Sequence, residues 1–315
     1  MVTQVEGRSN AEGVLQGSVP APPAVGPTAA AKAAKLPQRP DGPVGPFARQ
    51  VLLGRSEAGV AITQEQWCRK AGLDAIIIAS PNFTHIDILR DTMQTDLAHL
   101  VEKPMCTTME DALEIEERVK SFDPVFWVGL EYRYMPPVAR MIERAHAGDV
   151  GAMKMLSIRE HRFPFLPKVG NWNRFNKNSG GTFVEKCCHF FDLMRFILQE
   201  EPVAVMGMGG QAVNHLNEAY DGETPDIFDH GFVAVEFESG AKAQLDLCMF
   251  AEGSENQEEI TLVGDQAKLE VKIPEGVITF MPRRPKNPVK ETVEIDEAVL
   301  AAGSHFGSSY FQHLD

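Results

Sequence analysis

Three short apolar runs that alternate with segments of helical pattern constrain the fold of this chain more than any other feature. The runs cover residues 73–79, 97–101 and 125–129. The first of them, LDAIIIA, is rich in isoleucine, which is typical of a strand buried on both faces. Apolar residues such as Ile86 and Leu89 recur at helical spacing in the first intervening segment. The alternation predicts a right-handed parallel βαβαβ unit.

Polar or charged residues follow each of the three runs, at positions 80–82, 102–104 and 130–134. Ligands of parallel sheets bind beyond the carboxyl ends of the strands, so these segments predict a binding edge. Thr107 or Thr108 is expected to cap the helix that follows the second run.

The remainder of the chain predicts a mixed domain of helices and strands. A helix is expected at 135–147 and a strand at 153–162. Gly180 and Gly181 predict a turn, with Thr182 as the N-cap of one continuous helix over 183–198. Strands separated by short turns are expected at 203–206, 231–237, 241–250, 258–263, 267–273 and 277–280. Such a succession predicts an open, largely antiparallel sheet.

The charge balance and the cysteines exclude several classes of protein. Acidic residues outnumber basic ones by 44 to 30, which gives a formal net charge of −14 and argues against a nucleic-acid or anionic-membrane partner. No stretch approaches the roughly 20 apolar residues of a membrane span. The 5 cysteines are odd in number and contain no CxxC pair, so they are expected to be reduced thiols. A cytoplasmic location is therefore expected.

The first 49 residues differ in composition from the rest. They are rich in proline, alanine and glycine, and Phe47 is their only aromatic residue. Such a segment buries too little apolar surface to offset its ordering entropy, so it is expected to be a disordered tail. An organelle-targeting segment is the alternative, although the stretch is poor in arginine and serine.

Three motifs carry a resemblance to a known family. They are Ser80-Pro81-Asn82-x-x-His85, then Glu102-Lys103-Pro104, then Gly180-Gly181-Thr182-Phe183-Val184-Glu185-x-x-x-His189-x-x-Asp192. Together they resemble the Gfo/Idh/MocA oxidoreductases, the family of glucose–fructose oxidoreductase and inositol dehydrogenase. The resemblance runs from about residue 72 to the end of the chain.

The resemblance implies an α/β fold in which an incomplete Rossmann-type parallel sheet is followed by an α+β domain with an open, mainly antiparallel sheet. The expected domains are a disordered tail at 1–49, a partial dinucleotide-binding domain at 50–131, and a substrate-binding and oligomerisation domain at 132–315. In the family the outer face of the second sheet is the oligomer interface, so a homodimer or homotetramer is expected.

The chemistry of the third motif also follows from its residues. Glu185 and His189 are four apart, so on one helix they share a face. A histidine with a pKa near 6.5 can remove the hydroxyl proton as hydride leaves an alcohol carbon, and a carboxylate can fix its tautomer. By resemblance, Lys103, Glu185 and His189 form the catalytic group. Many members of the family carry aspartate where this chain has Glu185.

The remaining site residues are assigned to the cofactor and the substrate. The resemblance implies that the strand ends bind NAD or NADP through Ser80, Pro81, Asn82, His85, Glu102 and Lys103. Aromatic and cationic side chains that suit a polyol are Arg133, Trp172, Arg174 and Lys186. Lys186 is also a candidate for part of the proton transfer. No metal site is expected, because no second pair of ligands accompanies Glu185, Cys188 and His189.

The segment that should bind the pyrophosphate is not found in the sequence. No GxGxxG precedes Leu73, and the GxGxxA match from Gly207 to Ala212 is rejected because no amphipathic helix follows it. Family members also continue beyond the equivalent of Asp315. Two interpretations stay open. The chain is an NAD(P)-dependent oxidoreductase of a sugar, polyol or related secondary alcohol in truncated or mis-joined form, or it is a non-catalytic relative that serves as a sugar-binding or oligomeric partner protein.

Overall fold

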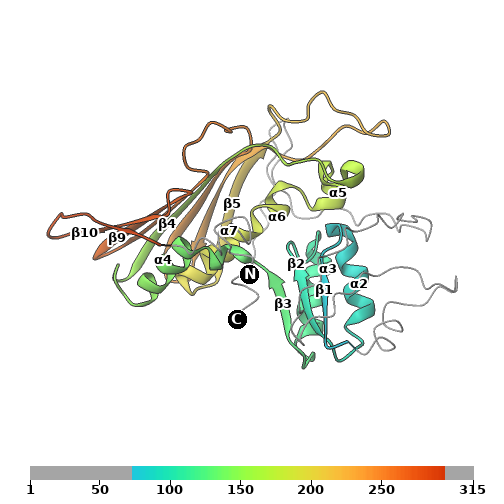
Figure 1. The fold of residues 1–315 in the computed structure, drawn as a ribbon, viewed down its shortest axis with the longest axis horizontal. Helices are drawn as coiled ribbons and strands as arrows, with labels where there is room; N and C mark the ends of the chain where they lie inside the picture. Colours follow the sequence, from blue (N-terminus) through green and yellow to red (C-terminus); the bar gives the residue numbers. More distant parts are fainter. Residues whose placement is uncertain (1–72, 295–315) are drawn as a thin grey trace, which may run out of the picture. The chain divides into compact units, whose positions relative to one another are not determined.

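The computed structural model describes residues 73–294, which form two units that divide between Val128 and Gly129 (Figure 1). The tail expected at 1–49, the residues from 50 to 72 and the segment from 295 to the end lie outside the described residues.

The first unit is a three-stranded sheet in the order β1-β2-β3. The strands are β1 (Ala75–Ile78), β2 (Ala98–Glu102) and β3 (Phe126–Gly129), and the helical segments are η1 (Asn82–Thr84), α2 (His85–Thr92) and α3 (Met109–Val119). β1 and β2 pair in parallel, with Ala75 opposite Ala98. The predicted βαβαβ unit is therefore confirmed.

Both helices of the first unit pack on the same face of its sheet. Right-handed crossovers that advance in one direction, from β1 to β2 to β3, place their helices on one side. The apolar cluster on that face contains Ile76, Ile78, Ile86, Leu89, Val101 and Ile115. Ile77 points away from it and is 64% exposed. The expectation that the first strand is buried on both faces was therefore wrong for the described residues.

A threonine begins α3, as the sequence indicates. The side chain of Thr108 accepts a hydrogen bond from the backbone N–H of Asp111 at 3.2 Å. Asp111 and Glu110 lie in the first turn, where the helix dipole favours acidic side chains. The cap is Thr108 rather than Thr107.

The second unit contains an eight-stranded sheet in the order β11-β10-β9-β8-β4-β7-β6-β5. Its strands are β4 (Met153–His161), β5 (Pro202–Gly210), β6 (His230–Phe237), β7 (Lys242–Cys248), β8 (Glu258–Gly264), β9 (Ala267–Ile273), β10 (Val277–Pro282) and β11 (Val289–Thr292). All neighbouring strands of this sheet are antiparallel except β4 and β7, which are parallel. The open, mainly antiparallel sheet is confirmed, and β11 is an additional strand.

Helices cover the inner face of the eight-stranded sheet. The helical segments of the second unit are η2 (Glu131–Tyr134), α4 (Pro136–His146), η3 (Val169–Arg174), α5 (Asn176–Ser179), α6 (Thr182–Glu185) and α7 (Cys188–Leu198). α4 contacts β9 and β10, and α7 contacts β4 (Figure 1). The core between them includes Leu156, Ile158, Phe190, Leu193 and Ile260. None of the described helices is both long enough and apolar enough to cross a membrane.

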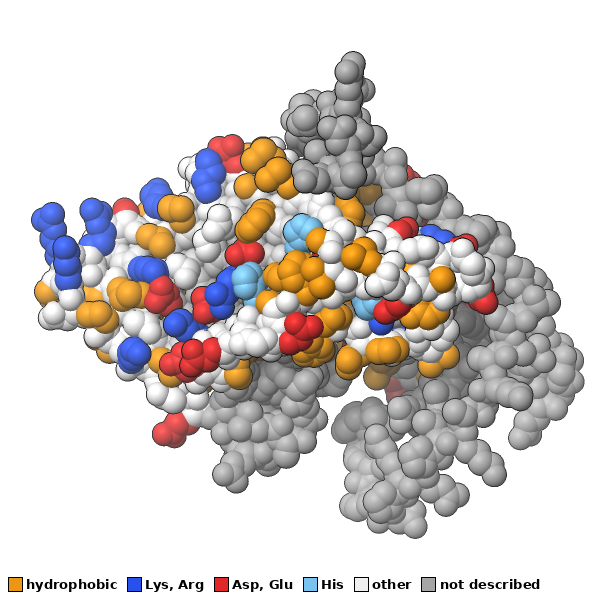
Figure 2. All heavy atoms as spheres, turned by 90° about the horizontal axis from the view of Figure 1, so that it is seen from above, with side chains coloured by type: hydrophobic (Ala, Val, Ile, Leu, Met, Phe, Trp, Pro, Cys, Tyr) orange, Lys and Arg blue, Asp and Glu red, His pale blue; other side chains and the backbone are white. Residues whose placement is uncertain are grey.

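The two ends of the eight-stranded sheet differ in character. Figure 2 shows lysine and arginine side chains at the end where β9 and β10 lie in Figure 1.

At the other edge, Gly207, Gly209 and Gly210 lie inside β5, paired antiparallel with β6. Rejection of the GxGxxA match as a nucleotide-binding loop is thereby confirmed, because these glycines form a strand and no βα turn.

Candidate active site

A double-glycine turn begins the segment that carries Glu185 and His189. Gly180 and Gly181 have φ angles of 80° and 81°, in the region that favours glycine. A Cβ on Gly181 would lie 2.3 Å from the side-chain oxygen of Asn176. The turn therefore requires glycine at 181 for backbone conformation and for space.

The helix expected after this turn is interrupted. α6 ends at Glu185 and α7 begins at Cys188, with Lys186 and Cys187 between them. Gly181 occupies the N-cap position, and Thr182 donates its hydroxyl hydrogen to the carbonyl of Phe228 instead of capping the helix. The prediction of a Thr182 cap was wrong, because this hydroxyl finds a partner across the fold. The prediction of one continuous helix was also wrong, because the helix is interrupted at Lys186, which turns inward to Glu160. Glu185 and His189 are both buried.

His189 packs flat against Tyr132 from η2. The two ring centroids are 4.1 Å apart and the planes differ by 11°. Tyr132 is 2% exposed and His189 3% exposed, so the stacked pair is buried. This contact fixes one face of the imidazole, which leaves its edge to carry the hydrogen-bonding chemistry.

An ion pair ties the same η2 segment to α7. Arg133 donates from Nε to Oδ2 of Asp192 at 2.6 Å, and its Nη2 donates to Oδ1. The guanidinium also lies over the ring of Phe196, 4.2 Å from its centroid. Such a bidentate pair fixes both side chains. Asp192, the last residue of the third motif, therefore holds Arg133 in place beside the helix that carries His189.

Lys186 lies in the break between α6 and α7 and points into the protein. Its side chain is 5% exposed, and its Nζ is 3.0 Å from Oε1 of Glu160 on β4. It also donates to the hydroxyl of Tyr132 and lies 4.6 Å from the centroid of that ring. The Tyr132 hydroxyl in turn donates to Glu258 on β8 at 3.3 Å.

Tyr132, Glu160 and Glu258 were not among the residues predicted from the sequence. Strand periodicity could have identified the two glutamates. In β4, Leu156 and Ile158 are buried, and Glu160 continues the same alternation. In β8, Glu258 precedes Ile260 in the same way. A glutamate in phase with a buried apolar face is the signal, because such a position requires a partner inside the protein.

Arg174 and Trp172 belong to η3, which precedes the double-glycine turn. Arg174 is 3% exposed, and its Nε donates to Glu218 at 3.3 Å. Glu218 also receives hydrogen bonds from His215 and Tyr220, each at 2.8 Å. Burial of Glu218 opposes its ionisation, but these hydrogen bonds outweigh that effect and lower its pKa. No local pattern in the sequence pointed to Glu218.

A buried aspartate anchors the loop that supplies Glu218. The carboxylate of Asp229 accepts hydrogen bonds from the backbone N–H groups of Ala212, Val213 and Asn214 at 2.7–3.0 Å. Its other neighbour is His230, whose Nδ1 is 2.8 Å away. Burial raises the pKa of Asp229, yet His230 and the backbone donors reverse this and lower it. Asp229 is therefore a charged anchor for the start of the loop.

The predicted cofactor residues lie at the strand ends of the first unit. His85 is fully buried, with Nδ1 3.0 Å from the carbonyl of Pro104 and Nε2 2.9 Å from the carbonyl of Ser80. Its ring links the turns after β1 and β2. Asn82 is buried, whereas Glu102 and Lys103 are partly exposed at the end of β2.

Across residues 73–294, histidine, cysteine and carboxylate side chains form no group of three that could hold a metal ion. Two of the buried or partly buried carboxylates pair otherwise: Glu160 with Lys186, and Glu218 with the hydroxyl of Tyr220.

Comparison with known proteins places both units in one family. Residues 56–130 match the family model described as "Oxidoreductase family, NAD-binding Rossmann fold". Residues 142–296 match the model described as "Oxidoreductase family, C-terminal alpha/beta domain". The two matches cover the sheets of both units.

Individual relatives agree with the family models. The chain is 30% identical over 176 residues to scyllo-inositol 2-dehydrogenase (NAD(+)) of Bacillus subtilis strain 168, which covers 56% of this chain and 48% of the relative. It is 31% identical over 135 residues to inositol 2-dehydrogenase of Rhizobium meliloti strain 1021, covering 43% and 39%. The chain thus spans about half the length, or less, of these curated relatives.

Among solved structures, levoglucosan dehydrogenase in complex with NADH and levoglucosan has the same fold. The TM-score is 0.67 with 18% sequence identity, and the match covers 78% of this chain and 71% of that one. The fold, the two family models and the three motifs agree: this chain belongs to the Gfo/Idh/MocA family of oxidoreductases, whose N-terminal domain is an NAD-binding Rossmann fold.

Proposed function

We propose that this chain derives from an NAD(P)-dependent dehydrogenase that oxidises a secondary alcohol of a sugar or polyol, with His189 as the general base. The observation that carries the proposal is the buried imidazole of His189, stacked on Tyr132 and preceded at i−4 by the buried Glu185. The relatives named for inositol favour a cyclic polyol as substrate.

Each member of the catalytic group has a distinct role in this proposal. His189 takes the hydroxyl proton as the carbon–hydrogen bond breaks, and Glu185 stabilises the imidazolium that results. Lys103, at the end of β2, polarises the substrate oxygen. The nicotinamide cofactor, when bound, accepts the hydride. Arg133, Trp172 and Arg174 remain the proposed substrate-binding residues, whereas Lys186, buried against Glu160 and the Tyr132 hydroxyl, is assigned a positioning role instead.

The strand ends of the first unit suit a dinucleotide. Parallel sheets bind nucleotides beyond the carboxyl ends of their strands, and the turns after β1 and β2 are linked there by His85. Ser80 adds a hydroxyl contact to Thr84 at 2.6 Å, which stabilises the first of these turns. Ser80, Pro81, Asn82, Glu102 and Lys103 would border the cofactor, and His85 would hold that border in shape.

A binding and turnover experiment tests the proposal on the full 315-residue chain. Quenching of tryptophan fluorescence by NADH and NADPH measures cofactor affinity, and NAD(P)H absorbance follows oxidation of a panel of inositols and sugars. We expect saturable binding in the micromolar range and turnover that His189→Asn and Lys103→Met each lower by at least 100-fold. A folded chain that binds neither nucleotide would instead support the non-catalytic interpretation, and melting-temperature shifts with the same panel would then test sugar binding.

We also propose that the chain forms a homodimer or homotetramer through the outer face of its eight-stranded sheet. Large apolar side chains on that face are Met155, Met206, Met208 and Phe232, which are 56%, 71%, 62% and 59% exposed. Met206, Met208 and Phe232 lie on the paired strands β5 and β6, and exposed apolar side chains grouped in this way are typical of an interface. We call these four residues the outer-face patch.

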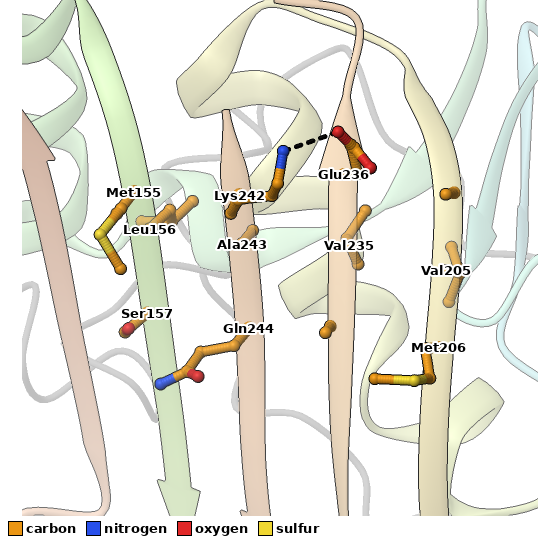
Figure 3. Close-up of a pocket in the computed structure, with 12 residues that line it drawn as sticks. Met155, Leu156, Ser157, Val205, Met206, Val235, Glu236, Lys242, Ala243 and Gln244 are labelled. Atoms are coloured by element: carbon orange, nitrogen blue, oxygen red, sulfur yellow. Dashed lines mark hydrogen bonds and ion pairs between the residues drawn. The ribbon is translucent and has the colours of Figure 1, made fainter. Parts of the chain in front are cut away.

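Figure 3 shows part of this face, where residues of β4, β5, β6 and β7, including Met155 and Met206 of the patch, border an open hollow of about 350 Å³. The ion pair of Lys242 with Glu236, at 2.6 Å, lies at its rim. Sedimentation velocity of the chain and of a Met206→Glu, Phe232→Glu variant tests the interface. We expect an oligomer that the double substitution converts to monomer; a monomeric parent chain would contradict the proposal.

A further inference from the structure

Two glutamates face each other on the buried side of the central sheet. β4 and β8 pair antiparallel, with Glu160 opposite Glu258. Their exposed fractions are 0% and 1%. Like charges directly opposite each other destabilise a sheet, and a buried carboxylate needs a partner. This pair therefore requires cations, a shared proton, or both.

The nearby cations form ion pairs with only one of the two glutamates. Oε1 of Glu160 is 3.0 Å from Nζ of Lys186 and 3.4 Å from Nη1 of Arg162. Glu258 has neutral partners instead: Gln257 donates to its Oε1 at 2.6 Å, and the Tyr132 hydroxyl donates to the same atom. The ion pairs therefore lie on Glu160, whereas Glu258 has no ion pair among the described residues.

Protonation of Glu258 resolves the conflict. Burial, and next the negative charge of Glu160, raise the pKa of Glu258 from 4.5 to about 8, with Lys186 opposing the shift. The neutral carboxyl of Glu258 can share a hydrogen bond with Glu160. Oε2 of each glutamate is buried and accepts nothing from the other described groups, and a shared proton satisfies both atoms.

Tyr132 connects this pair to His189. Its hydroxyl accepts from Lys186 and donates to Glu258, while its ring lies against the imidazole. Burial, followed by the charges of Glu160 and Glu258, raises the pKa of the Tyr132 hydroxyl well above 10, so this group stays protonated at working pH. The other charges that act on it are Arg162 and Glu131.

We propose that Glu160, Glu258, Lys186 and Tyr132 form a proton-sharing unit that positions the ring of His189 and sets the charge at the hydroxyl of the tyrosine against which that ring lies. In this unit one O–H bond breaks or forms: Glu258 loses its proton to solvent at alkaline pH and regains it on acidification, and no electrons are transferred. Loss of the proton adds one negative charge beside the Tyr132 hydroxyl, which favours the protonated form of His189 and makes it a stronger base. These four are positioning residues, and the inference rests on the proposed function only in taking His189 as the base.

A titration of His189 tests the unit without needing turnover. The full chain is labelled with ¹³Cε1-histidine, and the His189 resonance is identified by its loss in His189→Gln. We expect its chemical shift to move in two steps between pH 5 and 10, one for its own ionisation and one near pH 8 for the glutamate pair. Glu258→Gln should abolish the second step, and Glu258→Asp should retain it.

Two further variants keep the test decisive. Glu259→Gln is the matched control: Glu259 is the next residue, points to the outer face and pairs with Arg159 at 2.8 Å, so both steps should persist. Tyr132→Phe keeps the ring but removes the hydroxyl link, so the second step should shrink. A single-step titration of His189 in the parent chain, unchanged in Glu258→Gln and Tyr132→Phe, would overturn the inference. A chain without turnover that still shows both steps would count against the proposed function alone.

Discussion

The rings of Tyr132 and His189 are stacked, with centroids 4.1 Å apart, although 57 positions separate the two residues in the sequence. Replacing Tyr132 with leucine removes the flat surface that fixes the imidazole. Because small displacements of a catalytic group can cost about 100-fold in rate, we expect kcat/KM to fall by that order in Tyr132→Leu. Tyr132→Phe preserves the stack and should lose less than about 10-fold. NAD(P)H absorbance with the best polyol measures both, and equal activities of the two variants would argue that stacking is irrelevant.

The raised pKa of Glu258 predicts a pH-dependent stability. The folded state holds this proton up to about pH 8, whereas the unfolded chain releases it near 4.5. The stabilisation is therefore complete below pH 4.5 and is lost as the pH rises through this window, at up to about 1.4 kcal/mol per unit. We expect Glu258→Gln, measured against the parent chain by urea unfolding, to gain relative stability between pH 5 and 8 and to change no further above pH 9. A difference that is constant with pH would show that Glu258 is already ionised.

Substitution of Lys186 is expected to lower the free energy of unfolding strongly, and a second substitution at Glu160 is expected to restore much of it. Lys186→Met leaves the fully buried Glu160 with only the longer contact to Arg162, and an uncompensated buried charge costs about 3–5 kcal/mol. The double variant Lys186→Met, Glu160→Gln should recover much of that loss because no buried anion remains. As a control, Lys177→Met breaks an exposed pair with Glu223 and should cost less than about 1 kcal/mol. Failure of the double variant to recover would assign the loss to packing.

Adding a side chain at Gly181 is expected to strain the turn that precedes Glu185. Gly181→Ala combines a φ of 81° with a Cβ only 2.3 Å from Asn176, so we expect a loss above about 1 kcal/mol in unfolding free energy. Gly148→Ala shares the positive φ but has open space around its Cβ, and so isolates the backbone cost. Gly253→Ala has neither feature and should be neutral. Similar losses at 181 and 148 would show that contact with Asn176 contributes nothing.

Periodicity in the sequence predicted most of the described fold. The alternation of short apolar runs with helical segments identified β1, β2 and β3, and turn residues separated the strands from β5 to β10. The break between α6 and α7 could not be predicted in this way, because residues 183–198 keep a helical apolar pattern throughout. The break follows from contacts distant in sequence, such as Lys186 with Glu160. The exposure of Ile77 likewise depends on which face the crossover helices cover.

Sequence motifs predicted part of the candidate site, whereas residues without a distinctive local pattern were not predicted. Glu185 and His189 stood out because a carboxylate and a histidine share a motif, and both are buried. Tyr132 was overlooked because a tyrosine has no distinctive pattern until its stacking partner is known. Lys186 was noticed as a cation, but its buried partners come from β4 and β8, which no local pattern connects to it.

His85 has a consequence for how the turns at the strand ends of the first unit can change. One imidazole contacts the carbonyls of Ser80 and Pro104, so the turns after β1 and β2 are mechanically coupled. A neutral ring carries a single N–H and can donate to only one of them at a time. A substitution that shifts one turn is therefore transmitted to the other through a change in ring orientation or tautomer. A substitution that changes the conformation of one turn therefore also changes the other, so the two turns cannot be altered independently.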